Sequence, residues 1–389
     1  MSDGGGLVVL GSPSPIDTTA SLRYNGVLLT DDPMLTLLDL FSGCGGLTLG
    51  SKMAGFVTEL AVDIDPILSS SFGANFPATP FLAADVASLN SARLKALLPN
   101  GVSGVVGGPP CQAFSGMGKG LADDPRRSLL GEFFRIVSTV KPAFFLMENV
   151  PGLVFPNNRP VLDAAINSLG SSWEIIGPII LDASDFGAPT KRRRVFVFGF
   201  DKRKMRVPTL NDLVESDAYR VSVEDAIKDL TVASAVAGAT DLWRYGSDSV
   251  VSPYAQKMRS SSGQFTGHQL TEHKPSTLER FALVPQGGVD PVGKYKRLSW
   301  AGLCPTLRAG TGSDRGSYQA VRPLHPVENR VITPRECARL QGFPDDFIFH
   351  STVWHSCRMI GNSVSPIIAE ALLRNIRNFL KGPSDNEML

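Results

Sequence analysis

Cys111 is the residue of this sequence best placed for covalent chemistry. It follows two prolines and precedes polar Gln112 in the segment 107–115, which ends at Ser115. An apolar, strand-like run, Val102–Val106, leads into that segment. These neighbours are poor partners for a buried thiol, so we predict that Cys111 is a nucleophile presented on a loop.

A carboxyl group stands at the corresponding point of another strand. The buried run Phe144–Met147 ends in Glu148, about 40 residues after the cysteine. Functional groups gather at the carboxyl ends of strands in open α/β sheets, so this pair suggests a nucleophile with an acid partner. A thiol with a pKa of about 8.5 is only about 3% thiolate at pH 7. A helix N-terminus or a nearby cation would raise that fraction.

A third strand runs into a glycine-rich turn. In Leu38–Gly50 an apolar run is followed by closely spaced glycines that open a helix, so the backbone can approach a nucleotide-like ligand. The next strand ends at Asp63, placed for ribose hydroxyls, and the one after it at Asp85, placed for an adenine amino group. A nicotinamide enzyme is the alternative, but strict G-x-G-x-x-G is missing and Cys111 has no part in simple hydride transfer.

Two arginines alternate on a predicted strand after residue 190. Arg192 and Arg194 should point to one face, because side chains alternate along a strand. Two guanidinium groups there suit the binding of an anion or a carbonyl. Lys191 and Arg193 point to the other face, where a solvated charge and a phosphate contact are both open.

Composition bounds the class of protein. The 389 residues are 43% hydrophobic and 19% charged, which allows one large domain, a smaller one and a substantial core. The net charge is +1, so any nucleic-acid surface must be a local patch. An odd number of cysteines without a C-x-x-C pair argues against a disulfide framework or a zinc site. We expect no metal, a reducing compartment, and inert buried thiols at Cys44, Cys304, Cys337 and Cys357.

The sequence has no sign of a membrane segment or a leader. No apolar run reaches membrane-spanning length, and the N-terminus lacks a basic-then-apolar pattern. We therefore expect a soluble, intracellular protein with no membrane partner. Residues 1–32 are rich in Gly, Ser, Pro and Thr and are expected to form a flexible tail.

The remaining chain has an α/β pattern. Continuous apolar runs separated by helical patterns predict a parallel sheet covered on both faces. These runs are Leu35–Leu40, Val57–Val62, Val102–Val106, Phe144–Met147 and Val195–Phe200.

The composition changes near Asp201, which predicts a domain boundary. We expect one domain at 33–200, a loop-rich second domain at 201–330, a hinge segment at 331–354 and a C-terminal helix at 355–389 that returns to the first domain. Thr333 before Pro334 is a helix-capping pattern, and Pro366–Leu380 is amphipathic.

Taken together, these segments resemble the DNA (cytosine-5) methyltransferases, chiefly the bacterial restriction–modification type. The resemblance spans about Met34–Ala369. One departure is Thr190, where the family usually has glutamine before the basic strand. The matching motifs are Asp39–Gly43, Pro110–Gln112, Glu148–Val150, Arg192 with Arg194, Arg335–Pro344 and Gly361–Val364.

The resemblance implies a fold and a cofactor. The fold is a Rossmann-like S-adenosylmethionine-dependent methyltransferase domain with a smaller, loop-rich target-recognition domain at 201–330. S-adenosylmethionine is the cofactor, without a metal. The residues expected to bind it are Phe41, Ser42, Gly43, Gly45, Leu47, Asp63, Ile64, Asp85, Val86, Pro110, Asn362 and Ser363.

It also implies a mechanism. Cys111 adds to carbon 6 of a flipped-out cytosine, while Glu148 hydrogen-bonds ring nitrogen 3 and the amino group. Carbon 5 then takes the methyl group, and loss of its proton releases the cysteine. Arg194 holds the cytosine O2 and orients Glu148, with Arg192 supporting beside it. The glycine-dotted loop after Cys111 closes over the base.

DNA contacts are expected from two segments. Gln112 and Ser115 lie beside the nucleophile, and Thr306, Leu307, Arg308 and Arg315 lie in a Thr-Leu segment like the one that the family places in the major groove. Lys294, Lys296 and Arg297 are candidates to hold phosphates. For each of these charges a solvated surface position is the alternative.

Two rival classes belong to the same family. The RNA-methylating branch should carry a short recognition segment, against which the long region 201–330 speaks. A non-catalytic DNA-binding relative should have lost Cys111 or Glu148, and both are present. We therefore expect a monomeric, cytoplasmic, nucleoid-associated enzyme of a bacterium. It should act on a specific double-stranded DNA sequence and protect that site from a cognate restriction endonuclease.

Overall fold

The computed structural model describes residues 34–110, 128–247, 250–310 and 322–381. The chain divides into Met1–Met34 and Leu35–Leu389, and the second unit contains every helix and strand described. The tail predicted at residues 1–32 lies outside the described residues. Within the described ranges, no helix combines the length and the apolar character needed to cross a membrane.

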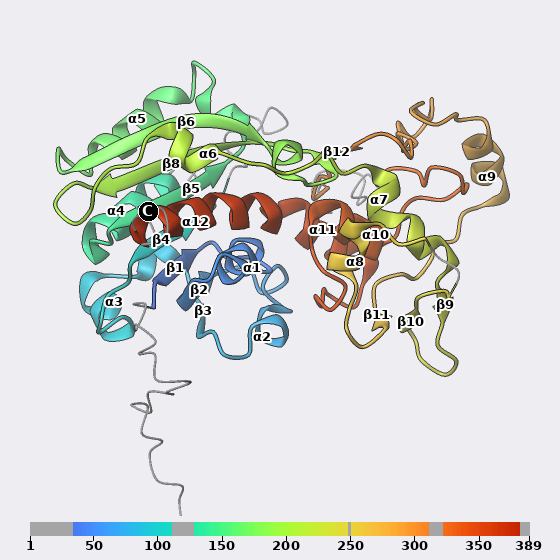
Figure 1. Ribbon diagram of the computed structural model, residues 1–389, viewed down its shortest axis with the longest axis horizontal. Coiled ribbons are helices and arrows are strands. Elements are labelled where there is room, and N and C mark those ends of the chain that lie inside the picture. Colours follow the sequence, from blue (N-terminus) through green and yellow to red (C-terminus); the bar gives the residue numbers. More distant parts are fainter. Residues whose placement is uncertain (1–33, 111–127, 248–249, 311–321, 382–389) are drawn as a thin grey trace, which may run out of the picture. The chain divides into compact units, whose positions relative to one another are not determined.

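A seven-stranded sheet forms the centre of this unit, in the order β3-β2-β1-β4-β5-β8-β6 (Figure 1). The strand pairs from β3 to β5 are all parallel. The bounds are β1 Thr36–Leu40, β2 Val57–Asp63, β3 Phe81–Ala83, β4 Gly104–Gly107, β5 Phe144–Asn149, β6 Trp173–Asp182 and β8 Arg193–Asp201. The apolar runs thus predicted these strands, apart from β3 and β6, and the α/β class is confirmed.

The direction of the last predicted strand corrects the expectation of a purely parallel sheet. β8 pairs antiparallel with β5, and β6 pairs antiparallel with β8. The reason is that β6 and β8 form a hairpin-like pair with only a short connection, which cannot provide the long crossover that a parallel pair needs. As a result the first residues of β8 lie beside the last residues of β5, where Asn149 faces Val195.

Helices cover both faces of the sheet, as predicted. On β5, Phe144 and Leu146 pack in one core with residues of α1 and α12, while Phe145 and Met147 pack in another with residues of α4. Figure 1 shows α12 running beside α1. The bounds of the covering helices are α1 Gly46–Met53, α2 Phe72–Asn75, α3 Ser91–Leu97, α4 Ser128–Val140, α5 Arg159–Asn167 and α12 Pro366–Lys381.

The segment that follows Asp201 has short elements joined by long connections. Its strands form a three-stranded sheet, β11-β10-β9, and β12 pairs in parallel with β7, which lies before Asp201. The short strands are β7 Thr190–Lys191, β9 Ser234–Ala235, β10 Trp243–Arg244, β11 Gln264–Phe265 and β12 Cys304–Pro305. The helices are α6 Leu210–Val214, α7 Val223–Ile227, α8 Pro253–Met258, α9 Pro275–Ala282, α10 Pro334–Gln341 and α11 Val353–Asn362.

Buried arginines organise this segment. Arg297 is 3% exposed and donates hydrogen bonds to the carbonyl oxygens of Phe281, His325 and Glu328 and to Asn329 Oδ1. The candidate role of Arg297 in holding a phosphate is therefore wrong, because its guanidinium is already bound inside the protein.

The two predicted C-terminal helices are confirmed. Thr333 caps α10 in a reciprocal arrangement with Glu336, which follows from the capping-box spacing. The predicted helix at Pro366–Leu380 is α12, one residue longer. The boundary expected at residue 355 falls inside α11, and the boundaries at 201 and 331 stay predictions.

Candidate active site

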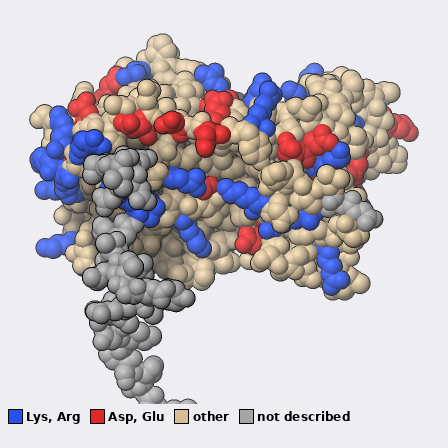
Figure 2. All heavy atoms as spheres, viewed as in Figure 1, with Lys and Arg blue, Asp and Glu red and all other residues tan. Residues whose placement is uncertain are grey.

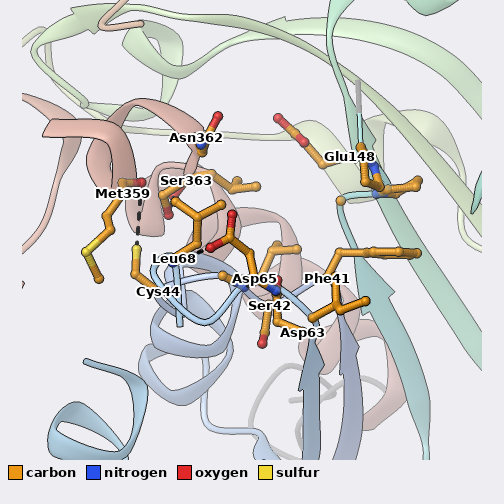
Figure 3. A pocket seen from close by; sticks show the side chains of 18 of the residues that line it. Phe41, Ser42, Cys44, Asp63, Asp65, Leu68, Glu148, Met359, Asn362 and Ser363 are labelled. Atoms are coloured by element: carbon orange, nitrogen blue, oxygen red, sulfur yellow. Dashed lines mark hydrogen bonds between the residues drawn. The ribbon is translucent and has the colours of Figure 1, made fainter. Parts of the chain in front are cut away.

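A cavity of about 370 Å³ lies at the carboxyl ends of β1, β2, β4 and β5 (Figure 3). The structure brings there almost every residue predicted to bind a cofactor. Those in the lining are Phe41, Ser42, Gly43, Leu47, Asp63, Ile64, Asp85, Val86, Pro110, Asn362 and Ser363. Gly45 is absent from the lining; it serves the turn by adopting a φ of 96° as the N-cap of α1.

The turn after β1 needs glycine because another segment approaches it closely. A Cβ built on Gly46 would lie 2.0 Å from Ser363 Oγ and 2.4 Å from the carbonyl oxygen of Val364. Phe41 has a φ of 59°, a left-handed conformation that costs a non-glycine residue roughly 1–2 kcal/mol. Such strain at a cavity wall is typical of a functional turn.

Asp63 links this turn to the end of β2. Its Oδ2 accepts a hydrogen bond from the amide of Gly43 at 2.7 Å, and its Oδ1 accepts one from the amide of Asp65 at 2.7 Å. Burial raises the pKa of Asp63, although these hydrogen bonds oppose the rise. Because a carboxylate can accept about four hydrogen bonds, lone pairs remain for hydroxyl groups of a ligand.

Asp85 stands one strand further along the same edge. Its Oδ1 accepts a hydrogen bond from the amide of Ala87 at 2.9 Å, which caps the short 3-10 helix at Val86–Ser88. The carboxyl group is therefore fixed in direction at the wall of the cavity.

An ion pair that was not expected from the sequence lies at the rim of the cavity. Arg358 Nη2 lies 2.8 Å from Asp65 Oδ2, and both residues line the cavity. The signal was available, because Arg358 precedes Asn362 by one helical turn on α11. Other lining residues that were not expected at the site include Cys44, Leu68, Ala84, Leu129 and Met359.

Glu148 and Arg194, both expected to act on the base, lie together in the wall of the cavity. Arg194 Nε lies 2.9 Å from Glu148 Oε1, and the two side chains are 13% and 11% exposed. Burial raises the pKa of Glu148 above its ordinary value, although the charges of Arg194 and Arg192 oppose the rise. The antiparallel direction of β8 creates this pair, because it brings the start of β8 to the end of β5.

Arg192 has a different environment from Arg194. It is 1% exposed and donates hydrogen bonds to the carbonyl oxygens of Leu307, Gly361 and Ser363 at 3.1, 2.9 and 2.7 Å. Arg192 is the residue between β7 and β8, so it is not itself part of the strand that carries Arg194. The contacts of Arg192 are those of a residue that positions the Gly361–Val364 segment.

The last described residues before Cys111 lie at this cavity. Gly108, Pro109 and Pro110 line it, and Asn149 Nδ2 donates a hydrogen bond to the carbonyl oxygen of Pro109 at 3.1 Å. A Cβ built on Gly108 would lie 3.3 Å from Glu148 Oε2, so the backbone passes close to the acid. Cys111, Gln112, Ser115 and Arg315 themselves lie outside the described residues.

The remaining predicted DNA contacts are next to Arg192. Thr306 Oγ1 donates a hydrogen bond to the carbonyl oxygen of Lys191 at 2.6 Å, and Arg308 is exposed. Leu307 is 5% exposed and packs in the core, which does not support a side-chain contact with DNA. Thr190 is buried and donates to the carbonyl oxygen of Cys304 at 3.2 Å, so it joins β7 to β12.

The four other cysteines are buried, as predicted. Burial raises the pKa of Cys44 to about 12, so its thiol stays protonated although it lines the cavity. Its Sγ lies 3.8 Å from the carbonyl oxygen of Met359, a contact that joins the turn before α1 to α11.

These residues fit S-adenosylmethionine. Asp63 keeps lone pairs for ribose hydroxyls, Asp85 is an acceptor for an amino group, and Phe41, Ile64 and Leu47 provide apolar walls. Acids at successive strand ends beside a glycine turn form the nucleotide-binding arrangement of open α/β sheets. Together with the antiparallel last strands, they define a Rossmann-like S-adenosylmethionine-dependent methyltransferase.

Comparison with known sequences identifies the family. The family model described as C-5 cytosine-specific DNA methylase matches residues 35–378. The type II methyltransferase M.XorII of Xanthomonas oryzae pv. oryzae is 36% identical over 377 residues, covering 90% of this chain and 87% of its own. The type II methyltransferase M.DdeI of Desulfomicrobium norvegicum is 32% identical over 381 residues, covering 88% of each.

Comparison with solved structures agrees. A crystal structure of a protein assigned as a prophage-encoded DNA modification methyltransferase (E. coli) matches with a TM-score of 0.77 and 36% identity, covering 90% of this chain and 100% of that one. The chain belongs to the C-5 cytosine-specific DNA methylase family. It is a DNA (cytosine-5)-methyltransferase, which transfers a methyl group from S-adenosylmethionine to carbon 5 of cytosine in DNA.

Proposed function

We propose that this enzyme methylates cytosine within one specific double-stranded DNA sequence, through a covalent adduct of Cys111 with a flipped-out base. The observation that supports this most is the Glu148–Arg194 pair, which lies in the same cavity as the cofactor turn. The loop that leads to Cys111 borders that cavity at Pro110. Nucleophile loop, acid and methyl donor can therefore act on a single base.

The chemistry begins with attack by the thiolate. Carbon 5 of cytosine is too weak a nucleophile to take a methyl group unaided. Addition of the Cys111 sulfur to carbon 6 forms a carbon–sulfur bond and turns carbon 5 into an enamine carbon. S-adenosylmethionine supplies an electrophilic methyl group. Carbon 5 takes it, then loses its proton, and the electron pair expels the cysteine.

Glu148 stabilises the charge that develops on the ring. Its carboxyl group hydrogen-bonds ring nitrogen 3 and the amino group of the cytosine. Burial raises the pKa of Glu148 above its ordinary value, which favours donation of a proton to the ring. Arg194 orients Glu148 through the 2.9 Å ion pair and holds the cytosine O2. Arg192 positions Ser363 rather than touching the base.

The base must leave the double helix to reach this cavity. Glu148 is only 11% exposed, so a stacked base cannot approach it. Base flipping solves this problem for enzymes that act on a ring atom. Similar proteins are named type II methyltransferases, which supports a protective role for this enzyme beside a cognate endonuclease. We propose a monomer for this setting.

Trapping the adduct tests the proposal. Bisulfite sequencing of DNA from a methylation-free host that expresses the enzyme should reveal one methylated sequence. A duplex with 5-fluorocytosine at that position should then bind the enzyme covalently, because fluorine cannot leave as a proton does. Cys111→Ala should abolish trapping and methylation but keep DNA binding. The matched control Cys304→Ala, which removes a buried thiol, should keep all three. Methylation retained by Cys111→Ala would overturn the assignment.

Arg308 and Arg315 test the site of sequence reading. An arginine that reads guanine contributes about 1–3 kcal/mol of discrimination. Arg308→Ala or Arg315→Ala should therefore relax the methylated sequence at one position, with cofactor affinity unchanged. If the arginine holds a phosphate instead, its loss should weaken binding to all sequences. The slope of log K against log salt concentration, here called the salt slope, should then fall in magnitude by about one unit. Wild-type site choice and wild-type salt slope in both variants would show that this segment does not read DNA.

A further inference from the structure

A second cavity, of about 410 Å³, lies against the paired strands β7 and β12. Three cationic residues line this basic pocket: Lys191, Arg220 and Lys296. No carboxylate is among its described lining residues, and none of the three cations has an ion-pair partner within the part of the chain that the structure describes. Figure 2 shows Lys and Arg side chains gathered near the upper edge, over the part that Figure 1 labels β12.

The backbone holds Lys191 in place. Its strand β7 pairs with β12, and Pro305 is the partner of Lys191 in that pair. The carbonyl oxygen of Lys191 accepts the 2.6 Å hydrogen bond from Thr306 Oγ1. The lysine therefore starts from a fixed position at the wall of the basic pocket.

The other two cations are fixed by their neighbours. Arg297 turns inward and makes four hydrogen bonds with buried oxygens, so the adjacent Lys296 is directed outward. Arg220 precedes Ser222, the N-cap of α7, and the first amide of that helix, Val223, donates to the carbonyl oxygen of Gly302 in the pocket wall. Separate contacts thus hold the backbone near each of the three cations, which all line one cavity.

The basic pocket is a short distance from the active site. Lys191 precedes Arg194 by three residues, which at full extension span at most about 11 Å. Leu307 follows the pocket residue Thr306, and its carbonyl oxygen accepts from Arg192. A Cβ built on Gly361 would lie 2.6 Å from the backbone of Arg308. One paired strand therefore connects the pocket to the Gly361–Val364 segment.

We propose that the basic pocket binds backbone phosphates of the DNA strand whose cytosine enters the active site. This inference rests on the proposed function. A flipped nucleotide remains attached to its strand, and about 11 Å corresponds to roughly three nucleotides at 3.4 Å each. Phosphates beside the target base therefore lie within reach of Lys191, Arg220 and Lys296. The net charge of +1 makes such a local patch necessary, because the whole molecule does not attract DNA.

We expect the basic pocket to contribute to DNA affinity and not to sequence recognition. Its charged groups are exposed cations, and the hydroxyl of Thr306 already donates to Lys191. Phosphate contacts set the position of a protein on DNA without distinguishing bases. Loss of these cations should therefore weaken binding equally on all sequences.

Salt titration of DNA binding tests the proposal. The probe is a fluorescein-labelled duplex of random sequence, and the variants are Lys191→Gln, Arg220→Gln, Lys296→Gln and the triple variant. Each lost contact should lower the slope of log K against log salt by about 0.9, so the triple variant should lose about 2 to 3 units. The matched control is Lys95→Gln, which removes an exposed lysine from α3 and should keep the wild-type slope. Affinity for S-adenosylmethionine, measured by calorimetry, should be unchanged in all variants.

The outcomes separate this proposal from the proposed function. A triple variant that keeps the wild-type salt slope overturns the phosphate site, even if the wild-type enzyme methylates DNA. A pocket that serves only free anions would show inorganic phosphate binding with an unchanged DNA slope, which also overturns it. A wild-type enzyme that forms no covalent 5-fluorocytosine complex overturns the proposed mechanism, whatever the slope.

Discussion

Charged groups are buried in both the central sheet and the segment after Asp201. Those in the sheet face a cavity, whereas those after it face other protein groups. In the sheet, Glu148 and Asp63 stand at strand ends and line the active site. After the sheet, Arg297 binds carbonyl oxygens, and Arg339 binds Asp345, Asp229 and a carbonyl oxygen. In the first region apolar strands build the core and leave polar groups for chemistry. In the second, buried arginines hold together chain that has little regular structure.

The surroundings of a buried charge indicate its role. Strand β5 is buried along its whole length and packs through Phe144–Met147, while Glu148 at its end pairs with Arg194 in the cavity wall. All eight residues of α10 are buried, including Arg335 and Arg339, although the helix is strongly polar. Burial of an ionic group without partners costs several kcal/mol. These arginines therefore need hydrogen-bond acceptors from the surrounding chain.

Glu148→Gln gives the largest expected effect. The amide cannot supply a proton at ring nitrogen 3, so methylation should fall by about 100- to 10,000-fold. Cofactor affinity should stay the same, because Glu148 is expected to face the base. Steady-state methylation and calorimetry measure the two quantities. Turnover within a factor of ten of the wild type would show that a buried charge at this strand end does not have to be catalytic.

Arg339→Met tests the other region through stability. It leaves Asp345 without its 2.6 Å partner and removes one of two arginines from Asp229, so we expect a loss of about 3–5 kcal/mol in the free energy of unfolding. Urea denaturation followed by fluorescence measures it. The control Arg159→Met breaks an exposed pair with Asp163 and should cost about 0.3–0.5 kcal/mol. Similar losses in both variants would contradict the structural role of buried arginines. If Arg339→Met does not fold, Arg339→Lys, which keeps the charge, should restore part of the stability.

Gly46→Ala should weaken cofactor binding more than it weakens the fold. The new methyl group would meet Ser363 Oγ and the carbonyl oxygen of Val364, so the Gly361–Val364 segment must move. We expect about a tenfold loss of affinity for S-adenosylmethionine, or about 1.4 kcal/mol. Gly73→Ala is the control, because a Cβ there would have no atom within 4 Å. Equal affinities in the two variants would show that the close approach at Gly46 has no role in binding.

Asp39→Asn should change how stability depends on pH. Burial raises the pKa of Asp39 to about 7 from an ordinary value of 3.8, while Thr48 opposes the rise and Asp63 adds to it. The folded state holds the proton more tightly, so this group stabilises the fold at low pH, and that stability is lost as pH rises to about 7.

The variant lacks this titration. The stability of the wild type relative to Asp39→Asn should therefore fall between about pH 4 and pH 7 and stay constant above pH 8. Urea denaturation at several pH values measures the difference. A difference that does not vary over this range would contradict the raised pKa of Asp39.

Much of the active site could be predicted because its signals are local. Asp63 and Glu148 each end an apolar run, and the glycines before α1 stand directly after another. Thr333 and Glu336 form a cap within four consecutive residues. In each case the physical cause, strand alternation, a turn or a cap, acts over a few neighbouring residues, so the order of residue types is enough. The catalytic assignment of Cys111 remains a prediction.

Residue order was enough to predict the α/β class, most of the strands of the sheet, and the acids and glycines that line the cavity. The choice between arginines that face the cavity and arginines that face the interior depended on the packing of distant segments. Arg194 reaches Glu148 because β8 runs antiparallel to β5, whereas Arg192 and Arg297 are bound to carbonyl oxygens far away in the sequence. An arginine beside a strand looks the same in a sequence whether it points to a ligand or to the interior. Its role depends on which distant chain segment packs against it, and that is settled only when the whole core forms.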